Sequence, residues 1–390
     1  MSFIHLHVHT VYSANDATAL IPKLAARADE LDMSALAITD HGNMHGVEEF
    51  YAECELRGVK PIIGCEVYVA CADGKLYHLT LLAENNTGFC NLVNLVYASH
   101  ENILNSKPAI NKSSLAGKTD GLIALSGCIG GEVSRKVLES NYDDALASAL
   151  EYKELFAPDC FFIEITTHGW IHNVKINPSL VKISVDAGLP VVATNDVHMV
   201  SREDGRRFVA IRGEQTNFEA RRLYLMTRDE MFSQMNKFSE TESAIDNANR
   251  IAERCNVDLA KASAALDPQV RELITPKSAP PPILEYVTKV SGLEAHEAQK
   301  GKWIWEFREL SDGQKKKLYN AIVLQHSLNR EKTYCLPGKK EKRSIYSAIK
   351  AELAEIETFP EMPDLELKRL VEKYVNRLNE QAKRKQLAES

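Results

Sequence analysis

The chain lacks several patterns that would assign it to a common class of protein. Its eight cysteines never form a Cys-x-x-Cys pair, so we expect no structural zinc ribbon. Its first residues contain neither a basic segment nor an uninterrupted apolar core, so we expect no signal peptide. No stretch reaches the roughly 20 apolar residues that a membrane span needs. We therefore expect a cytoplasmic protein with reduced thiols and no membrane contact.

Two further absences narrow the fold and the function. The net charge of −7 gives no overall attraction to nucleic acid, although local basic patches can override a global sum. No Gly-rich dinucleotide fingerprint is present, which weighs against a doubly wound nucleotide-binding fold. A chain of 390 residues has room for one large α/β domain and a smaller unit, or for two domains.

What is present, over residues 1–275, is a repeated alternation of β-rich and helical segments. This alternation predicts an α/β fold with a parallel sheet or a TIM-like barrel. The predicted strands are Phe3–His9, Ala35–Thr39, Pro61–Val69, His78–Leu82, Leu122–Ser126, Phe161–Thr166 and Pro190–Thr194. The predicted helices are Pro22–Asp32, Val47–Arg57, Phe89–His100, Asp143–Phe156, Ser179–Asp186 and Ser243–Cys255.

The character of the chain changes after a proline-rich segment at 276–282, which we interpret as a linker. Residues 283–390 are charged, short of β-rich runs and predicted to be helical. The basic cluster Lys315–Lys317 and the pair Trp303 and Trp305 are compatible with DNA binding, but a solvated helix face explains such charges more simply.

Histidines recur at the very start of the chain. In a strand, alternate residues point to one face, so His5, His7 and His9 are expected to lie together. A row of imidazoles buried in an apolar core would leave nitrogen atoms without partners. Metal binding resolves this problem, because each neutral imidazole offers one lone pair to a cation.

Other ligand-type residues follow the ends of the predicted strands, which is where TIM-like barrels place their chemistry. One by one, such residues are weak indicators, but six strands contribute to the set. Besides His7 and His9, the set contains Asp40, His41, Glu66, Cys128, His168, Asn195, Asp196 and His198. His78 does not fit this rule, because it opens its strand. The set predicts a metal site at one end of the barrel.

The donors also indicate the kind of metal. Imidazoles, carboxylates and a thiol suit Zn²⁺, Mn²⁺ or Fe²⁺ better than Mg²⁺ alone. There are more donors than one tetrahedral ion can use, so we expect two or three divalent ions that share bridging carboxylates. Clusters of this type are typical of phosphoester hydrolysis.

Several motifs follow one another over residues 1–260. They are His5–Ser13, Ile38–Asn43, Lys60–Glu66, Tyr77–Thr80, Leu125–Cys128, Ala193–His198, Leu223–Met226 and Ile251–Asn256. Taken in this order, they resemble those of the PHP (polymerase and histidinol phosphatase) family. More narrowly, the sequence is similar to the N-terminal PHP domain of the bacterial DNA polymerase III alpha subunit.

The resemblance implies a PHP-type distorted (β/α)7 barrel whose active form holds three metal ions. The implied ligands are His7, His9, Asp16, His41, Glu66, His78, Cys128, Asp196 and His198. It thereby adds Asp16 and accounts for His78. Because all nine positions have ligand-competent side chains, it implies a phosphodiesterase that acts as a 3′→5′ exonuclease on DNA. We expect Asp40 and Asn195 to orient neighbouring imidazoles, His5 to be structural and His168 to face substrate.

Two alternatives remain open. The domain could dock a replication partner, such as a proofreading subunit or the rest of a split polymerase, or it could be a small-molecule phosphatase like the histidinol-phosphate branch. Met362–Glu366 resembles a polymerase carboxylate motif only faintly, and an amphipathic helix N-capped at Asp364 explains it better. We therefore expect no polymerase activity from this chain.

Overall fold

The structure is a computed structural model. It describes residues 2–13, 16–166, 171–205, 222–235, 239–274, 294–299 and 302–306. The chain divides into two compact units, Met1–Lys277 and Ser278–Ser390. The predicted linker at 276–282 and His168 lie outside the described residues. Within those residues, no helix is long and apolar enough to cross a membrane.

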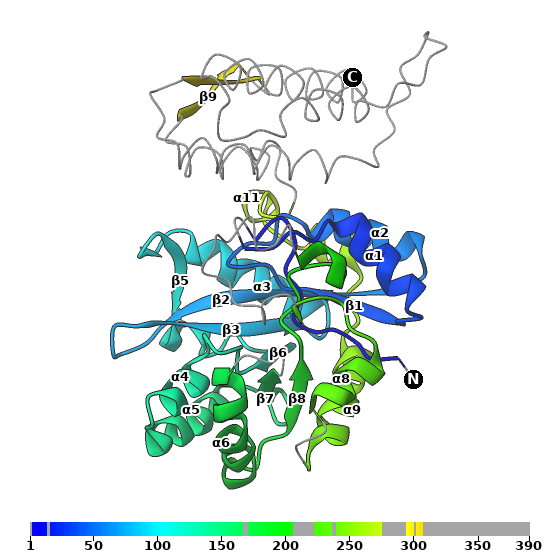
Figure 1. Ribbon diagram of the computed structural model, residues 1–390. Helices are drawn as coiled ribbons and strands as arrows, with labels where there is room; N and C mark the ends of the chain where they lie inside the picture. The colour runs from blue at the N-terminus through cyan, green and yellow to red at the C-terminus, as the bar shows by residue number, and fades with distance from the viewer. Residues whose placement is uncertain are drawn as a thin grey trace, which may run out of the picture. The chain divides into compact units, whose positions relative to one another are not determined.

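The first unit is a mixed α/β structure built on one eight-stranded sheet (Figure 1). Its strands are β1 (Ala35–Ile38), β2 (Lys60–Ala70), β3 (Leu76–Ala83), β4 (Ile103–Leu104), β5 (Lys107–Asn111), β6 (Leu122–Leu125), β7 (Phe161–Thr166) and β8 (Val191–Thr194). The order along the sheet is β4-β5-β2-β3-β6-β7-β8, and β1 pairs with β2. The six strands predicted from Ala35 onward are confirmed.

The helices of this unit surround the sheet (Figure 1). They are α1 (Ile21–Glu30), α2 (Val47–Leu56), α3 (Asn86–Ser99), α4 (Glu132–Leu138), α5 (Tyr142–Leu155), α6 (Ile171–Ala187), α8 (Arg228–Met235), α9 (Thr241–Arg254), α10 (Leu259–Ala264) and α11 (Pro268–Arg271). The six predicted helices are confirmed. The short helix α4, which begins four residues after Cys128, was not predicted, and neither were α8, α10 and α11.

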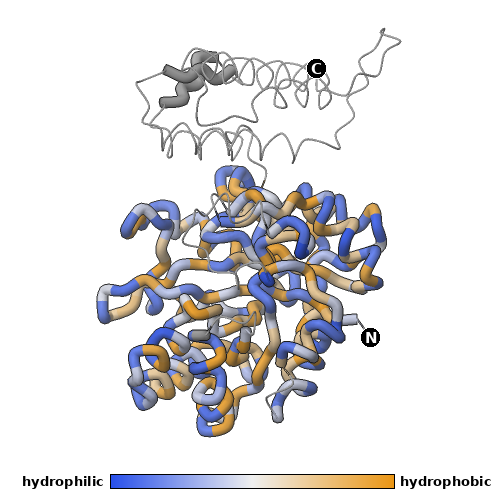
Figure 2. Tube along the Cα trace, in the orientation of Figure 1, coloured by the Kyte–Doolittle hydropathy of each residue, from blue (hydrophilic) through white to orange (hydrophobic). Residues whose placement is uncertain are grey.

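The spacing of apolar residues along the chain explains why these helices and strands form. Hydrophilic and hydrophobic stretches alternate along the helices, as the tube in Figure 2 shows. In α1 the buried residues Ile21, Leu24, Ala25 and Ala28 follow the helical repeat, and a proline stands in its first turn. The strands β1 and β6 are instead apolar at every position and completely buried, as expected for strands covered on both faces.

The first predicted strand, Phe3–His9, is wrong as a regular strand. Only Val8 forms a bridge, to Val197, and the segment is otherwise irregular extended chain. The hydroxyl of Thr39 accepts the hydrogen bond of the Val8 N–H at 2.8 Å, so a side chain takes the place of a ladder partner. The sequence does not reveal this substitution, because Thr39 also suits a strand end.

This segment nevertheless closes the sheet into a ring. On one side it accepts hydrogen bonds from two backbone N–H groups, that of Ala37 in β1 and that of Thr39 directly after β1. On the other side it exchanges hydrogen bonds with Val197, which follows β8. Together with β1, β2, β3, β6, β7 and β8, it makes a distorted seven-membered barrel, in agreement with the predicted fold class.

The strand β3 runs antiparallel to both of its neighbours, β2 and β6, whereas the remaining barrel strands pair in parallel. The start of β3 therefore lies at the edge where the parallel strands end. This reversal explains why His78 opens its strand and still reaches the same end of the barrel as the other candidate ligands.

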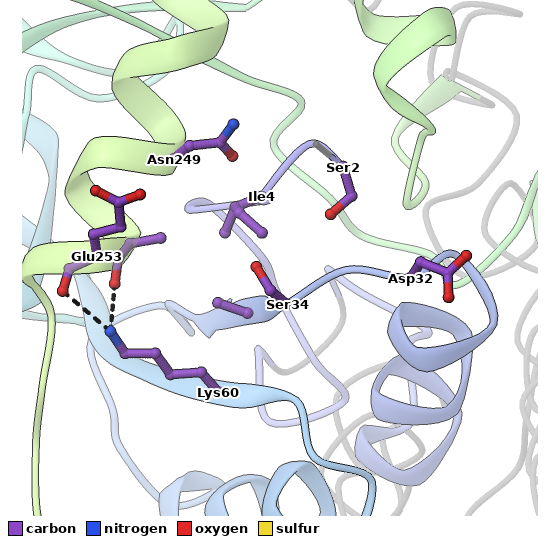
Figure 3. Close-up of a pocket in the computed structure, with 9 residues that line it drawn as sticks. Ser2, Ile4, Asp32, Ser34, Lys60, Asn249 and Glu253 are labelled. Atoms are coloured by element: carbon purple, nitrogen blue, oxygen red, sulfur yellow. Dashed lines mark hydrogen bonds between the residues drawn. The ribbon is translucent and has the colours of Figure 1, made fainter.

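A cavity of about 370 Å³ lies near the opposite end of the barrel (Figure 3). Lys60, the first residue of β2, lines it together with Ser34 and Ala35 at the start of β1. The Lys60 ammonium donates to the backbone oxygens of Ala252 at 2.7 Å and Glu253 at 3.2 Å. These carbonyls belong to the last turn of α9, so Lys60 supplies partners that the helix end lacks.

In the second unit the structure describes one hairpin. Its strands are β9 (Glu294–Gln299) and β10 (Lys302–Glu306), which pair antiparallel. The sequence predicts a helical region here, and for this segment the prediction is wrong. Trp303, Ile304 and Trp305 have high strand propensity, which accounts for β10. The cluster Lys315–Lys317, Met362–Glu366 and the predicted final helix lie outside the described residues.

Candidate metal centre

All nine predicted ligands meet at one end of the barrel. They belong to the first segment (His7 and His9), the loop after it (Asp16), the residues after β1 (His41), β2 (Glu66), β3 (His78) and the loops after β6 (Cys128) and β8 (Asp196 and His198). Three overlapping trios have donor atoms within 4.8 Å of one another: His9, His41 and His198; His7, His9 and Glu66; and His41, Glu66 and His78.

The Glu66 carboxylate lies at the centre of the cluster and is 1% exposed. Its Oε2 is 2.7 Å from Nδ1 of His41, and its Oε1 is 2.9 Å from Nδ1 of His78. The two Nε2 atoms of His7 and His9 each lie 3.4 Å from one of its oxygens. Imidazole nitrogens therefore lie beside both oxygens of this carboxylate, so either oxygen could hold a metal ion together with them.

The hydrogen bonds of His7 determine which of its nitrogens carries a proton. Its Nδ1 is 2.6 Å from Oε1 of Glu164, and an ionised carboxylate only accepts hydrogen bonds, so Nδ1–H donates. In the neutral ring, Nε2 therefore keeps a bare lone pair that points into the cluster. Burial lowers the pKa of His7, but the carboxylates of Glu164, Asp196 and Glu66 raise it by more than burial lowers it. The pKa of His7 is therefore well above its usual value.

His9 is held in the same way through a relay. The Ser13 hydroxyl donates to Oδ1 of Asp40 at 2.6 Å, so it accepts from Nδ1–H of His9 at 2.9 Å. The Nε2 of His9 then carries a lone pair 3.1 Å from Nε2 of His7. Burial and the neighbouring imidazoles lower the pKa of His9 to about 3, which keeps its ring neutral. Asp40 thus positions an imidazole, but through Ser13.

A second group surrounds Asp16. Its Oδ2 lies 2.7 Å from Nε2 of His41 and 3.2 Å from Nε2 of His198. Nδ1 of His198 donates to the backbone oxygen of Asp196 at 2.7 Å, so its Nε2 also presents a lone pair in the neutral ring. Asp16, which only the resemblance supplied, is therefore as closely integrated as the histidines.

Asp196 has a backbone φ of +47°, in the left-handed region that few non-glycine residues adopt. This conformation places its Oδ1 3.4 Å from Nε2 of both His7 and His9. That oxygen is buried and has no hydrogen-bond partner among the described residues. Backbone strain of this kind persists where the surrounding structure enforces it, commonly at functional sites.

Cys128 completes the set. Its Sγ is 3.7 Å from Oε1 of Glu66 and 3.9 Å from Nδ1 of His78, and the backbone N–H of Gly130 points to it at 3.5 Å. Burial and the carboxylates of Asp196 and Glu66 raise its pKa well above the usual value for a thiol. The thiolate that metals bind would form here only beside a cation.

The charges of the cluster fit divalent cations. Despite burial, neighbouring imidazoles hold the pKa values of Glu66 and Asp196 well below their usual range, so both carboxylates are ionised. Among the described residues, no lysine or arginine forms an ion pair with either of them. Carboxylates raise the pKa values of His7 and His41, that of His41 to about 10, so protons on these two rings balance part of the negative charge. A metal ion binds the deprotonated rings and replaces those protons, so the residues fit a metal centre.

Glu164 was not among the predicted site residues. Asn195 was expected to orient an imidazole, and its contacts do not support this role. Glu164 accepts from His7 and from the hydroxyl of Thr194 at 2.5 Å. A single glutamate inside the apolar strand Phe161–Thr166 was the available signal. Asn195 donates to the backbone oxygens of Arg222 and Tyr224 at 2.8 and 2.9 Å, and none of its described hydrogen bonds reaches an imidazole.

His5 lies outside the cluster. Its Nε2 is 3.0 Å from both the backbone N and the backbone O of Met226. Burial lowers its pKa to about 4, so the ring is neutral. It joins the first segment to the residues before α8.

Comparison with known proteins shows which sequences this chain resembles. Residues 5–168 match the family model of the PHP domain. The chain is 37% identical over 274 residues to DNA polymerase III subunit alpha of Borreliella burgdorferi, a match that covers 65% of this chain and 24% of the relative. For the same subunit of Thermus aquaticus, the values are 38% over 282 residues, 66% and 23%.

The chain thus spans about a quarter of the length of these relatives. Among solved structures, an amidohydrolase from Chromobacterium violaceum aligns with 17% identity and a TM-score of 0.33, over 50% of this chain and 87% of that one. The family match and the sequence similarity lead to one conclusion: over residues 5–168 the chain is a PHP domain, similar in sequence to the alpha subunit of DNA polymerase III.

Proposed function

We propose that this chain is a metal-dependent phosphodiesterase that removes nucleotides from the 3′ ends of DNA. One observation carries the proposal: Nε2 of His7 and of His9 lies 3.4 Å from the buried carboxylates of both Glu66 and Asp196, and none of the described lysines and arginines pairs with either carboxylate. Such a site needs cations, and two or three Zn²⁺, Mn²⁺ or Fe²⁺ ions suit its mixture of imidazole, carboxylate and thiol.

Bound ions would lower the pKa of a water molecule and neutralise charge on a phosphoester. Residues of this chain would hold the ions in place. Glu164 fixes the ring of His7, and the Asp40–Ser13 relay fixes that of His9. Partners of this kind set both the tautomer and the direction of the lone pair. Glu66 would hold the ions together with these imidazoles.

The choice of DNA as substrate rests on the similarity to DNA polymerase III alpha subunits. The same similarity suggests a replication polymerase or a proofreading subunit as a partner. The metal centre alone is equally suited to a compact phosphate monoester, so substrate class is the question that the experiment has to decide.

The test is incubation of metal-loaded protein with a mismatched primer-template labelled at its 3′ end. We expect release of the 3′ nucleotide with Mn²⁺ or Zn²⁺, and loss of release in His9→Ala and Asp196→Ala. His172→Ala is the matched control, because His172 is an exposed histidine in α6, outside the cluster. Its activity should equal that of the wild type.

Metal content is measured alongside for each variant. Protein that binds metal but releases no nucleotide from DNA would refute the exonuclease. If that protein hydrolyses a nucleotide monoester instead, the centre is that of a small-molecule phosphatase.

A further inference from the structure

A short hairpin lies at the edge of the sheet beside the metal centre. It consists of β4 and β5, and β5 pairs in parallel with β2, with Ala109 opposite Tyr68 (Figure 1). The two turn residues, Asn105 and Ser106, have φ values of 50° and 61°. Two consecutive left-handed residues form the tight turn that matches the twist of a two-residue hairpin.

The hairpin is in contact with the cluster through Tyr68. The Tyr68 ring stacks on that of His41, with 5.7 Å between ring centres, and meets the ring of His78 edge to face at 5.1 Å. The ammonium of Lys107 lies 4.2 Å from the centre of the Tyr68 ring. One aromatic ring therefore separates this ammonium from two of the proposed ligands.

Gly42 fixes the distance between the hairpin and the backbone next to His41. Its φ is +56°, and a Cβ added there would lie 2.8 Å from Cγ of Pro108 and 3.4 Å from the Tyr68 ring. Only glycine permits both this conformation and this close approach. The hairpin is therefore held against the rim of the metal centre.

Three exposed side chains give this hairpin an unusual surface. Lys107 is exposed, and among the described residues no carboxylate forms an ion pair with it. Ile103 and Leu104, at the tip, are 55% and 38% exposed. An ammonium suits a phosphate, and adjacent aliphatic side chains suit the face of a base. This combination is complementary to a nucleotide chain.

We infer that the β4–β5 hairpin is a substrate-binding arm for single-stranded DNA. Lys107 binds a phosphate adjacent to the one that is cleaved, and Ile103 and Leu104 contact a base near the 3′ end. The inference rests on the proposed function for the identity of the substrate. It adds a binding element outside the nine metal ligands.

The first experiment compares Lys107→Ala and Lys107→Arg with the matched control Lys118→Ala. Lys118 is also exposed, but it lies shortly before β6, near the end of the barrel opposite the cluster. The probe is a single-stranded oligonucleotide with a 5′ fluorescein and a 3′-terminal phosphorothioate linkage that slows cleavage. Fluorescence anisotropy gives its Kd at several salt concentrations.

We expect Lys107→Ala to raise Kd about tenfold, as the loss of a charged contact predicts. The slope of log K against log salt should fall by about 0.7, the value for one phosphate contact on a single strand. Lys107→Arg should retain the slope, and Lys118→Ala should match the wild type. Equal behaviour of Lys107→Ala and Lys118→Ala would overturn the assignment of Lys107.

The aliphatic contact is tested with the double variant Ile103→Ser, Leu104→Ser. It should bind the oligonucleotide more weakly without a change in salt slope, because no charge is removed. The wild type should bind an oligonucleotide with an abasic 3′ residue more weakly than the intact one, and the double variant should bind both equally. A double variant that still discriminates between them would refute the base contact.

Hydrolysis of bis(p-nitrophenyl) phosphate separates this inference from the proposed function. The wild type and Lys107→Ala are both assayed with this small diester. If the wild type hydrolyses no phosphodiester, the proposed function fails, and the binding results still decide the role of the hairpin. If Lys107→Ala loses hydrolysis of the small diester, Lys107 acts on the centre and not on the DNA strand.

Discussion

Two buried polar networks in this barrel have opposite designs. One is the metal-centre cluster, and the other surrounds Glu132, the first residue of α4. Both place a carboxylate of 3% exposure or less among several polar partners. They differ in where the compensating positive charge comes from.

Glu132 is neutralised by side chains of the chain itself. Its Oε1 accepts from the ammonium of Lys136 at 2.7 Å and from the hydroxyl of Ser148 at 2.9 Å. Its Oε2 accepts from the ammonium of Lys112 at 3.0 Å and from the thiol of Cys71 at 3.2 Å. Two cations and two neutral donors thus satisfy one anion, as a structural network requires.

Glu66 is surrounded by imidazoles instead of ammonium groups. Outer hydrogen bonds to Glu164 and Ser13 direct the lone pairs of His7 and His9 toward it. The lesson is that burial of charge does not by itself indicate a binding site. The indication is a buried carboxylate whose partners are imidazoles, because a metal ion can replace the protons of imidazoles but not those of ammonium groups.

The comparison is tested most strongly at Glu132. Glu132→Ala leaves the half-buried ammonium of Lys136 without an anion and the buried ammonium of Lys112 with Glu151 alone, so the free energy of unfolding should fall by about 3 kcal/mol. Bound metal per folded protein should not change. Urea denaturation with metal analysis measures both quantities. A variant that lost metal and kept its stability would show that Glu132 belongs functionally to the cluster.

Glu164 is the corresponding position on the metal side. Glu164→Ala removes the acceptor that orients His7, and the affinity for metal should fall by about 10–100-fold. Titration against a competing chelator measures this affinity. Glu164→Gln keeps an oxygen for Nδ1–H of His7 and should lose less. If both variants bind metal as the wild type does, the orientation of His7 is not what sets affinity.

A smaller effect is expected from pH. Burial raises the pKa of Glu132, but Lys136 and Lys112 outweigh it and lower the value from 4.5 to about 2. A depressed carboxylate pKa stabilises the folded state above the unfolded pKa, and this contribution is lost as pH falls from about 4.5 toward 2. Glu132→Gln should therefore show a flatter decline over that interval.

Chemical denaturation of both proteins in the presence of chelator tests this prediction, because it removes the pH dependence of metal binding. Parallel curves for the wild type and Glu132→Gln between pH 5 and 2 would contradict it.

Much of this fold was predictable from local patterns. Short, mostly apolar runs located β1, β6, β7 and β8, and the helical repeat of apolar residues located α1 and α9. The failures arose where a side chain or a distant strand determines the geometry. Thr39 replaces a backbone partner of Val8, and the reversal of β3 depends on pairing with β2 and β6.

The candidate site shows the same division. The alternation of His7 and His9, and the position of Asp196 and His198 after a buried strand, indicated a metal site without any structure. Asp16 has no local signal and entered only through family resemblance. Asn195 follows the same strand, yet its amide binds the backbone of Arg222 and Tyr224, which no local pattern specifies.

By itself, the sequence determined which kinds of donor are available and that several would gather at the carboxyl ends of strands, because residue type and strand periodicity are local properties. The tertiary structure decided which nitrogen of each imidazole faces the cluster. That choice depends on outer partners far away in the chain, such as Glu164 for His7 and Asp40, through Ser13, for His9. Hydrogen-bond direction is a property of atoms brought together in space, and only the closed barrel brings these atoms together.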